Sequence, residues 1–450
     1  MNKNSMVFTT DSYKVSHWLQ FPPGTEKTFY YIESRGFSGS EFSLNGEIIT
    51  NKTLFFGLQA IIKKILMDVP TKEDVKVAAE FWKAHGLDCF NYDGWMNIAE
   101  MGFYPLKIKA VPEGSIIDCH QVLVTIENTD PEFFWLPGWI ETRLLQVWYP
   151  ISVATKSWTC KKVIMDFLER TGDPAGIDFK LHSFGYRGVS SQESAEIGAM
   201  AELVNFMGTD TVAGIFAAQE YYNTNDMLGF SIPAAEHSTI TSWGRDGELD
   251  AYKNMLDQFA APGSIVAVVS DSYDIYNAVE NLWGDKLKQQ VIDSGATIVI
   301  RPDSGDPAKV VHSLCEILDS KFGSTRNDKG YKVLNNVCII QGDGIDGPET
   351  IYDIYNEAML SCFSADNIAL GMGGGSLQQV NRDTYKFAMK CSAAKINGVW
   401  RDVYKSPVGA KWKKSKRGRI ESLNMRTVFL DGRLLVDEDF GTIRERAVKA

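Results

Sequence analysis

The chain lacks several features that would place it in a membrane or on nucleic acid. Its 450 residues contain no apolar run near the ~18 residues that a membrane span needs. Residues 1–5 lead into no stretch typical of a signal peptide. Basic residues are not in excess, because 46 Lys and Arg oppose 57 Asp and Glu for a net charge of −11. We therefore expect a cytoplasmic protein that binds neither membranes nor nucleic acid.

Cysteine is scarce and dispersed. The seven cysteines include no C-x-x-C pair, which predicts reduced thiols and excludes a disulfide framework or a cysteine-rich zinc site. No internal repeat or low-complexity tract is present, and 44% of the residues are hydrophobic. This composition is typical of one large domain or of two to three ordinary ones.

The strongest break in composition lies at residues 171–176 (TGDPAG). It follows a helical pattern and precedes a strand-like run, so we place a domain boundary there. Before it, residues 28–32 and 106–117 are expected to be strands, and 54–69 and 72–83 helices. We predict an α+β domain over residues 1–175, joined by the C-terminal segment 391–450.

After the break, short apolar runs end in polar or glycine-rich turns and are followed by helical patterns. These runs begin near residues 179, 265, 297, 337 and 368. The alternation predicts a parallel sheet that is buried on both faces. Ligands of such sheets bind at the carboxyl ends of the strands, where the polar turns lie. Residues 176–390 are therefore expected to form a β/α barrel-like catalytic domain.

Two of these turns have the composition of anion-binding sites. After Arg187, Ser190 and Glu193 fit a helix capping box with Ser190 as N-cap. The glycines at 373–375 precede Ser376, which begins a second S-x-x-Q pattern. A glycine cluster before a helix offers backbone N–H groups to a phosphate. An ordinary left-handed turn is the alternative at each site, but two such turns at one sheet edge favour phosphate binding.

Carboxylates follow three of the predicted strands. Asp303 comes two residues after Arg301, and Asp271 and Asp343 occupy the same place on two other strands. Carboxylates that meet at one mouth can hold hydrated Mg²⁺ or ribose hydroxyls. Helix capping is the alternative for each, although Asp306, which precedes a proline, is the better cap. We assign Asp303 and Asp343 to function and leave Asp271 open between the two roles.

Two further features stay open at this point. His237 lies among candidate site residues at 231–238 and is a general base, a phosphate-binding group or a core histidine, of which the core role is favoured from the residues alone. Residues 411–419 hold six Lys and Arg. A solvated loop, a nucleic-acid patch and a local cover over a polyphosphate all fit this segment.

Longer blocks of the sequence resemble the nicotinamide phosphoribosyltransferase family. They are residues 10–15 (TDSYKV), 182–193 (HSFGYRGVSSQE), 208–214 (GTDTVAG), 233–240 (PAAEHSTI), 270–277 (SDSYDIYN), 300–305 (IRPDSG) and 341–344 (QGDG). The resemblance runs from about residue 8 to the C-terminal hydrophobic stretch. It implies the fold of type II phosphoribosyltransferases, an irregular β/α barrel beside an α+β domain, in a homodimer with shared active sites.

The resemblance also implies a reaction. A phosphoribosyl group would pass from 5-phosphoribosyl-1-pyrophosphate to nicotinamide, giving nicotinamide mononucleotide and pyrophosphate for NAD salvage. Mg²⁺ would be the cofactor, with Asp271 and Asp303 as its candidate ligands. ATP would be a coupled co-substrate, hydrolysed through phosphorylation of His237. The catalytic residues would then be His237, Asp303 and Arg301.

Binding roles follow from the same resemblance. Phe184 would stack on one face of the pyridine ring, Tyr13 of the partner subunit would cover the other, and Asp210 would accept the carboxamide N–H. The other substrate-binding positions are Arg187, Ser231 and Arg301 near the base, Asp303, Gly342 and Asp343 for the ribose, and Gly373 and Gly374 for the 5′-phosphate. The diphosphate and ATP phosphates would contact Arg35, Arg187, His237, Arg301, Arg382, Lys390 and Lys405.

The chain departs from the family's pattern in two places. The segment 419–427 is shorter than in vertebrate members, and Ala267 stands where those members have a serine facing the tunnel behind the base. The nearest alternative function is a nicotinate phosphoribosyltransferase, against which the carboxylate of Asp210 argues because it would repel nicotinate. A secreted signalling or binding protein and an unrelated phosphate-binding isomerase barrel are the remaining alternatives.

Overall fold

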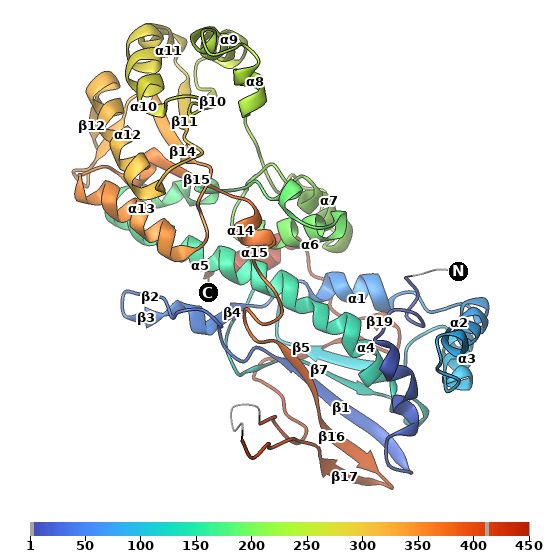
Figure 1. The fold of residues 1–450 in the computed structure, drawn as a ribbon. Coiled ribbons are helices and arrows are strands. Elements are labelled where there is room, and N and C mark those ends of the chain that lie inside the picture. Colours follow the sequence, from blue (N-terminus) through green and yellow to red (C-terminus); the bar gives the residue numbers. More distant parts are fainter. Residues whose placement is uncertain (1–3, 410–413, 450) are drawn as a thin grey trace.

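Seven strands from both ends of the chain form an antiparallel sheet at one end of the molecule (Figure 1). The structure is a computed structural model and describes residues 4–409 and 414–449. The sheet order is β17 (Val399–Asp402), β16 (Ala388–Ile396), β1 (Thr25–Glu33), β7 (Val122–Asn128), β5 (Leu106–Ala110), β18 (Arg426–Leu430) and β19 (Arg433–Leu434). The C-terminal strands thus pair with N-terminal ones, and Tyr31 of β1 lies opposite Lys390 of β16.

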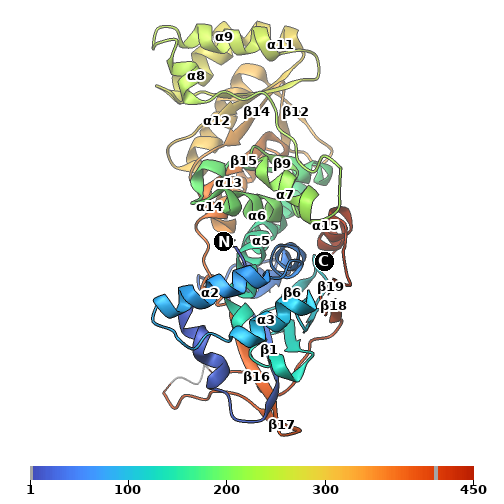
Figure 2. The same ribbon diagram turned by 90° about the vertical axis from the view of Figure 1, so that its right-hand side faces the viewer.

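A six-stranded parallel sheet lies toward the other end of the molecule (Figure 2). Its order is β10 (Ile265–Val269), β11 (Thr297–Arg301), β14 (Val337–Gln341), β15 (Ile368–Met372), β8 (Leu181–Ser183) and β9 (Gly208–Thr209). The segment 230–234 joins its two edges, because Phe230 bridges to Gly208 and Ala234 bridges to Ala267. The sheet therefore closes into an irregular β/α barrel, which confirms the predicted fold class.

Helices cover both sheets. Around the antiparallel sheet are α1 (Leu58–Leu66), α2 (Lys72–Ala84), α3 (Tyr92–Met101) and α4 (Leu136–Leu144). On the barrel side are α6 (Gln192–Glu202), α7 (Ala213–Tyr221), α8 (His237–Thr241), α9 (Glu248–Phe259), α10 (Ile275–Asn277), α11 (Lys288–Ser294), α12 (Pro307–Phe322), α13 (Pro348–Leu360), α14 (Gly374–Leu377) and α15 (Phe440–Lys449). The described residues also form two-stranded sheets from β2 (Ser43–Leu44) with β3 (Glu47–Ile48), β4 (Lys52–Leu54) with β6 (Ile116–Asp118), and β12 (Ser324–Arg326) with β13 (Lys332–Leu334).

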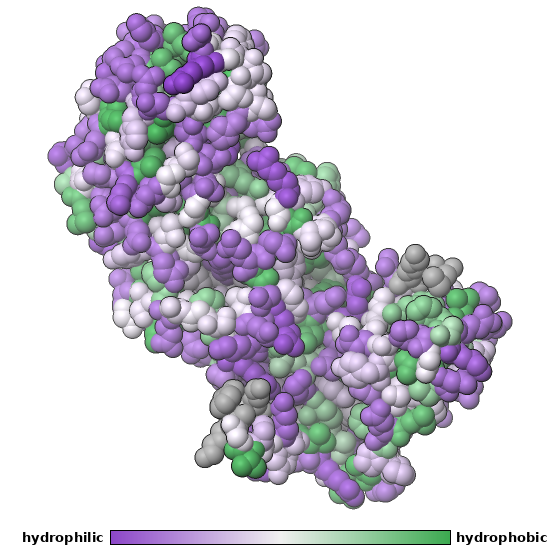
Figure 3. Space-filling model, in the orientation of Figure 1, coloured by the Kyte–Doolittle hydropathy of each residue, from purple (hydrophilic) through white to green (hydrophobic). Residues whose placement is uncertain are grey.

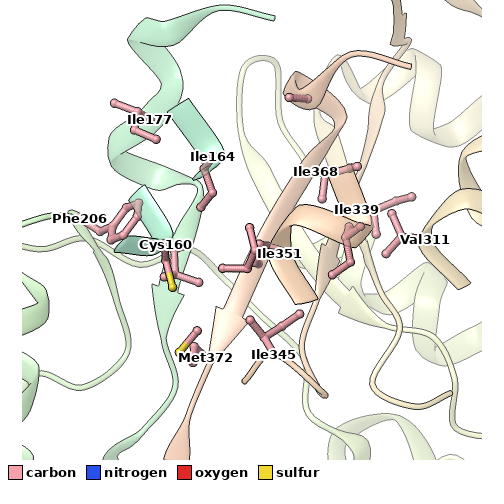
Figure 4. Packing of buried hydrophobic residues seen from close by; sticks show 14 of the residues in the cluster. Cys160, Ile164, Ile177, Phe206, Val311, Ile339, Ile345, Ile351, Ile368 and Met372 are labelled. Carbon is pink, nitrogen blue, oxygen red and sulfur yellow. The ribbon is translucent and has the colours of Figure 1, made fainter. Parts of the chain in front are cut away.

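The long helix α5 (Trp148–Thr171) crosses the middle of the molecule between the two sheets (Figure 1). Its buried residues Cys160 and Ile164 belong to the barrel's hydrophobic core together with Ile351 and Ile368 (Figure 4). Each such side chain contributes about 1.5–3 kcal/mol when it is fully buried. Since α5 lies before the composition break at 171–176, the core of the barrel extends into the segment N-terminal to that break.

Two expected elements are interrupted in the structure by glycine. The predicted helix over 54–69 begins only at Leu58, because Gly57 adopts a left-handed φ of 96°. The predicted strand over 106–117 divides into β5 and β6, and the turn between them contains Gly114 at φ 84°. The predicted helix over 72–83 is confirmed as α2, which Thr71 caps.

Polar residues cover most of the face shown in Figure 3, with apolar residues in scattered patches. Within residues 4–409 and 414–449, no helix is long and apolar enough to cross a membrane.

Candidate active site

His237 lies between two carboxylates that follow neighbouring barrel strands. It is the first residue of α8. Its Nε2 atom is 3.0 Å from Oδ1 of Asp271, which follows β10, and its Nδ1 atom is 3.9 Å from Oδ2 of Asp303, which follows β11. The histidine side chain is 45% exposed, so it is not a core residue. One edge of the ring is held by protein while the residue stays accessible to a ligand.

Asp271 holds His237 in place. Its side chain is only 4% exposed, and its Oδ2 atom accepts hydrogen bonds from the Asp303 backbone N–H (2.9 Å) and the Ser304 hydroxyl (2.6 Å). Burial raises the pKa of Asp271, but the hydrogen bonds from Ser304, His237 and Asp303 outweigh it, so the pKa lies below its usual value. The carboxylate is therefore ionised at neutral pH.

Neither Asp271 nor Asp303 serves as a helix cap. Asp274 caps α10, where it accepts from the N–H groups of Tyr276 and Asn277. Asp306 caps α12 by accepting from the Lys309 N–H, which confirms the predicted cap. The capping alternative is thus wrong for Asp271, and both carboxylates are directed into the cluster around His237.

Arg301 and Asp303 form an ion pair that fits closely against Gly342. The Nη2 atom of Arg301 lies 2.9 Å from Oδ1 of Asp303. A Cβ atom on Gly342 would lie 2.5 Å from that carboxylate oxygen and 2.7 Å from Arg301 Nε, so a larger residue there would displace the ion pair. Within the described part of the chain, this buried Nε has no hydrogen-bond partner. It is an N–H donor available to a ligand at the barrel mouth.

Phe184 lies between Arg301 and a glycine that the sequence analysis did not single out. The guanidinium of Arg301 is 5.5 Å from the centroid of the Phe184 ring, which is a cation–π contact. A Cβ atom on Gly371 of β15 would overlap the same ring. The sequence signal was a glycine inside a strand, which often marks a close approach. Phe184 also packs against the small buried cluster of Ala267, Val299 and Ile340 on the barrel strands.

Asp210 and Ser231 meet at the seam where the barrel closes. Ser231 donates its hydroxyl hydrogen to Oδ1 of Asp210. The backbone N–H of Asp210 donates to the carbonyl of Ser183, the residue before Phe184 (3.0 Å). Both side chains are exposed. The carboxylate of Asp210 is therefore oriented by Ser231, accessible to a ligand, and carried by a segment next to the one that carries Phe184.

The two predicted anion-binding turns pack against each other. A Cβ atom on Gly188 would lie 3.3 Å from the backbone nitrogen of Gly374, so the loop that carries Arg187 contacts the glycine loop. Arg187 is exposed there, as is Asp343 after β14. The strand ends thus bring together most of the predicted substrate-binding positions of the barrel domain.

Both predicted helix starts at these turns are wrong. The N-cap of α6 is Ser191, whose hydroxyl accepts from the Ser194 N–H, so the helix begins one residue later than predicted, after a short 3₁₀ turn at Tyr186–Gly188. Ser376 does not begin a helix but lies inside α14, which starts at Gly374 after Gly373 as N-cap. The flexible glycines allow this earlier start.

A second group of predicted phosphate ligands lies on the half of the molecule with the antiparallel sheet and comprises Arg35, Lys390 and Lys405. Burial lowers the pKa of Lys390, and the nearby cations Arg35, Lys405 and Lys14 lower it further, against the opposing effect of Glu141. These side chains therefore form a cluster of positive charge. It contains a free donor, because in the described residues the buried Nη2 atom of Arg35 has no hydrogen-bond partner.

Tyr13 and Arg382 also lie outside the barrel-end cluster. Tyr13, in the N-terminal 3₁₀ helix Ser12–Leu19, is 61% exposed and contacts only His17 among the aromatic rings described. Arg382 pairs with its neighbour Asp383 at 2.9 Å. No hydrogen bond or ion pair between described residues joins Tyr13, Arg382 or the positive cluster around Lys390 to the predicted site residues at the ends of the barrel strands.

The basic segment 411–419 lies partly outside the described residues. Of its described members, Lys416 pairs with Glu33 at 2.8 Å and Arg419 pairs with Glu127 at 3.3 Å. Both carboxylates belong to strands of the antiparallel sheet, and Glu33 also pairs with Arg35. This part of the segment therefore lies next to the positive cluster, and its predicted role over a polyphosphate remains a prediction.

The carboxylates at the barrel mouth suit a cation that is shared with a substrate. In the portion of the chain that is described, no group of three His, Cys, Asp or Glu side chains could hold a metal ion alone. Asp271 and Asp303 are nevertheless adjacent, with one oxygen of Asp271 accepting from the Asp303 N–H. Mg²⁺ is typically bound by one or two carboxylates, with water and substrate phosphate completing its shell. These two residues fit that mode of binding.

Comparison with known proteins identifies relatives of the whole chain. Residues 179–433 match the family described as "Nicotinate phosphoribosyltransferase (NAPRTase) family", and residues 5–108 match "Nicotinamide phosphoribosyltransferase, N-terminal domain". The chain is 52% identical over 439 residues to the nicotinamide phosphoribosyltransferase of Xanthomonas campestris, covering 97% of this chain and 91% of that one. It is 31% identical to the protein of the same name from Mycoplasma pneumoniae, covering 94% and 97% of the two chains.

Two solved structures share the fold at low sequence identity. One is a nicotinate-nucleotide pyrophosphorylase from Pyrococcus furiosus, with a TM-score of 0.59, 14% identity, and coverage of 100% of this chain and 95% of that one. The other is human nicotinic acid phosphoribosyltransferase, with a TM-score of 0.55, 15% identity, and coverage of 98% and 93%. Both support the barrel and antiparallel-sheet architecture.

Proposed function

The chain belongs to the nicotinate phosphoribosyltransferase family, and we propose that it transfers the phosphoribosyl group of 5-phosphoribosyl-1-pyrophosphate to nicotinamide in cytoplasmic NAD salvage. The products are nicotinamide mononucleotide and pyrophosphate. The observation that carries this choice is the hydrogen bond from the Ser231 hydroxyl to the carboxylate of Asp210. The backbone N–H of Asp210 in turn donates to the carbonyl of Ser183, the residue before Phe184.

This pair selects the base. The carboxylate of Asp210 accepts the carboxamide N–H of nicotinamide in a charge-assisted hydrogen bond, and it repels the carboxylate of nicotinate. The Ser231 hydroxyl fixes the orientation of that carboxylate. Phe184 stacks on the pyridine ring, and Arg301 lies within reach of the amide oxygen and the phosphates.

Positioning and charge stabilisation supply the catalysis. Displacement of pyrophosphate from C1 of the ribose creates an oxocarbenium-like centre, which needs a held nucleophile and a stabilised leaving group. Asp303, Gly342 and Asp343 hold the ribose hydroxyls. The glycine loop at 373–374 receives the 5′-phosphate, and Arg187 and Arg301 bind the diphosphate. Mg²⁺, when held by Asp271 and Asp303 with the diphosphate, supplies neutralisation of the leaving group's charge.

ATP hydrolysis through His237 couples to this reaction. The imidazole is exposed, and its Nε2 is held by Asp271 while Nδ1 lies toward Asp303. A carboxylate that holds one imidazole nitrogen fixes the tautomer and the orientation of the ring. Its other nitrogen then attacks the γ-phosphate of ATP, with departure of ADP.

Two copies of the chain form the complete site. The other positions predicted to contact the base or phosphates lie in or beside the elements of the antiparallel-sheet half: Tyr13, Arg35, Arg382, Lys390 and Lys405. That half and the barrel are at opposite ends of the molecule (Figures 1 and 2). In a homodimer, that half of one subunit covers the barrel mouth of the other. Its positive cluster then meets the diphosphate or the ATP phosphates.

One assay tests the proposed function. The purified protein is supplied with phosphoribosyl pyrophosphate and Mg²⁺, with nicotinamide or nicotinate, and with or without ATP. We expect nicotinamide mononucleotide as the main product and a higher yield with ATP. A preference for nicotinate would support the nicotinate phosphoribosyltransferase alternative, and absence of both products would contradict phosphoribosyl transfer.

A further inference from the structure

Lys156 of the long helix α5 is hydrogen-bonded to the glycine loop at 373–375. Its Nζ atom donates to the carbonyl of Gly375 at a distance of 2.7 Å. The lysine is half-buried, and it is not among the site residues predicted from the sequence. An ammonium group that is partly withdrawn from water needs its hydrogen-bond acceptors, so this contact restrains the loop from the side of α5.

A second donor on α5 holds the segment that follows this loop. Tyr149 lies about two helical turns before Lys156, so both side chains leave the helix on the same face. The Tyr149 hydroxyl is 3.0 Å from the carbonyl of Leu377 and 2.9 Å from that of Ser194, and it can donate to either. The short helix α14 is thus held against α5 through its carbonyl groups (Figure 1).

Lys156 is a cation at a part of the loop that also lies beside acidic residues. A Cβ atom on Gly375 would lie 2.8 Å from the carbonyl oxygen of Ile345 and 3.7 Å from the Cα atom of Asp346, so the loop packs against the segment after β14. Burial lowers the pKa of Lys156, and the carboxylates of Asp346 and Glu349 oppose this effect through space. In the described part of the chain, Lys156 forms no ion pair with either carboxylate. Without Lys156, the charged groups named here would all be negative.

We propose that Lys156 is a positioning residue for the 5′-phosphate of the phosphoribosyl substrate. The inference rests on the proposed function, because that assigns the glycine loop at 373–374 to this phosphate. Lys156 holds the loop by the carbonyl of Gly375, and its positive charge offsets Asp346 and Glu349, which would otherwise repel a phosphate dianion. The phosphate therefore meets a loop whose shape and charge are set before it binds.

This role concerns the phosphate and not the base. Within residues 4–409 and 414–449, no hydrogen bond or ion pair joins Lys156 to Phe184, Asp210 or Ser231, which form the proposed base site. The hydrogen bond of Lys156 is instead made to the loop after β15. Loss of its charge should therefore weaken the binding of ligands that carry a 5′-phosphate and leave the binding of ligands without one unchanged.

The test compares two ligands that differ by this phosphate, nicotinamide mononucleotide and nicotinamide riboside. Calorimetric titration gives the Kd of each, and the Kd of the riboside divided by that of the mononucleotide measures the contribution of the 5′-phosphate. Lys156→Met removes the charge at similar side-chain length, and we expect this ratio to fall about tenfold. Lys162→Met is the matched control and should keep the ratio, because Lys162 lies on the same helix with its Nζ over the Trp158 ring.

Two further variants keep the test decisive if Lys156→Met does not fold. Lys156→Gln also removes the charge but keeps a polar side chain, and we expect the same fall in the ratio. Lys156→Arg keeps the charge, so its ratio should lie closer to that of the wild type than to that of Lys156→Gln. An unchanged ratio in either folded neutral variant, or an equal fall in Lys156→Arg, would overturn the inference.

Kinetics separate this role from general damage to the fold. In Lys156→Met we expect KM for phosphoribosyl pyrophosphate to rise about tenfold, with KM for nicotinamide and kcat little changed. An equal rise in both KM values would contradict a role confined to the phosphate.

The binding ratio also separates failure of the inference from failure of the proposed function. A wild type that prefers the mononucleotide but makes no nucleotide would contradict the proposed reaction alone. A wild type that binds both ligands equally would contradict the assignment of the glycine loop, and the inference with it. A wild-type preference that persists in the neutral variants would contradict the inference alone.

Discussion

The Nε2 atom of His237 lies 3.0 Å from Oδ1 of Asp271, and the other oxygen of that carboxylate accepts from the Asp303 backbone. One buried aspartate thus fixes both the histidine and the start of the turn after β11. Because Asp271 is ionised over the neutral range, this link between neighbouring barrel strands does not depend on a proton. His237, the proposed phosphohistidine, and Asp303, the proposed ribose-binding residue, are therefore held next to each other.

His237→Ala should separate nucleotide synthesis from ATP hydrolysis. We expect loss of the phosphoenzyme and of ATP-driven stimulation, because the accepting nitrogen is removed. Slow synthesis should remain, since the contacts to base and ribose lie elsewhere. Radiolabelled ATP and a product assay measure both effects, with Asp271→Asn as the variant that keeps the imidazole but weakens its orientation. Normal ATP stimulation in His237→Ala would contradict the phosphohistidine.

Asp210→Ser should change the choice of base. A charge-assisted hydrogen bond contributes about 1.5–3 kcal/mol, and two anions 4 Å apart repel by about 4 kcal/mol at an effective dielectric near 20. Half of the combined effect is roughly a hundredfold preference for nicotinamide. The variant should lose most of this preference as kcat/KM for nicotinamide falls. The same ratio of kcat/KM for the two bases in variant and wild type would show that selectivity is set elsewhere.

Mixing Tyr13→Ala with Asp303→Ala should restore activity lost in each variant alone. If the partner's Tyr13 completes the site, a mixed dimer contains one intact site built from the two unaltered residues. Activity is measured after subunit exchange, which mass spectrometry of differently tagged subunits verifies. Exchange without recovery would indicate that each site is formed within one chain.

Gly371→Ala should impair use of the base without unfolding the protein. The added methyl group would overlap the ring of Phe184, which must rotate or shift away from Arg301. We expect kcat/KM for nicotinamide to fall about tenfold or more, equivalent to about 1.4 kcal/mol. Gly176→Ala is the matched control, because its nearest neighbour, the Cε of Lys180, lies 3.7 Å away. Equal kinetics in the two variants would contradict the packing role of Gly371.

Glu438→Gln should reduce stability at neutral pH more than in acid. Glu438 pairs with Arg426 at 2.6 Å and with Arg446 at 2.7 Å. Burial raises its pKa, but the two arginines outweigh this, so the pKa lies below the ordinary 4.5. The ionised form therefore stabilises the fold above about pH 4.5, and this contribution is lost as pH falls through the lower folded pKa.

Thermal unfolding between pH 3.5 and 7.5 tests this dependence. We expect the variant to lose about 2 kcal/mol at pH 7 through two weakened charge-assisted hydrogen bonds. The gap to the wild type should narrow in acid. A gap that stays constant across this range would show that the loss comes from packing and not from charge.

Much of the barrel follows from local sequence. The apolar runs at 265–269 and 297–300 lie in β10 and β11, because β-branched residues flanked by polar turns fit a strand that is buried on both faces. Asp306 was recognisable as a cap, since its effect depends only on the next three residues. Exceptions occurred where glycine conformation decided the outcome, as at Gly57 and Gly373, because φ at glycine is not determined by its neighbours.

The sequence by itself determined which residue types follow each barrel strand, and therefore which chemical groups gather at the strand ends. Only the tertiary structure decided that Asp271 holds His237, that Gly371 makes room for Phe184, and that Ser231 donates to Asp210. Each of these contacts joins segments far apart in the chain. Their geometry depends on barrel closure through residues 230–234 and on packing against α5, which no local pattern encodes.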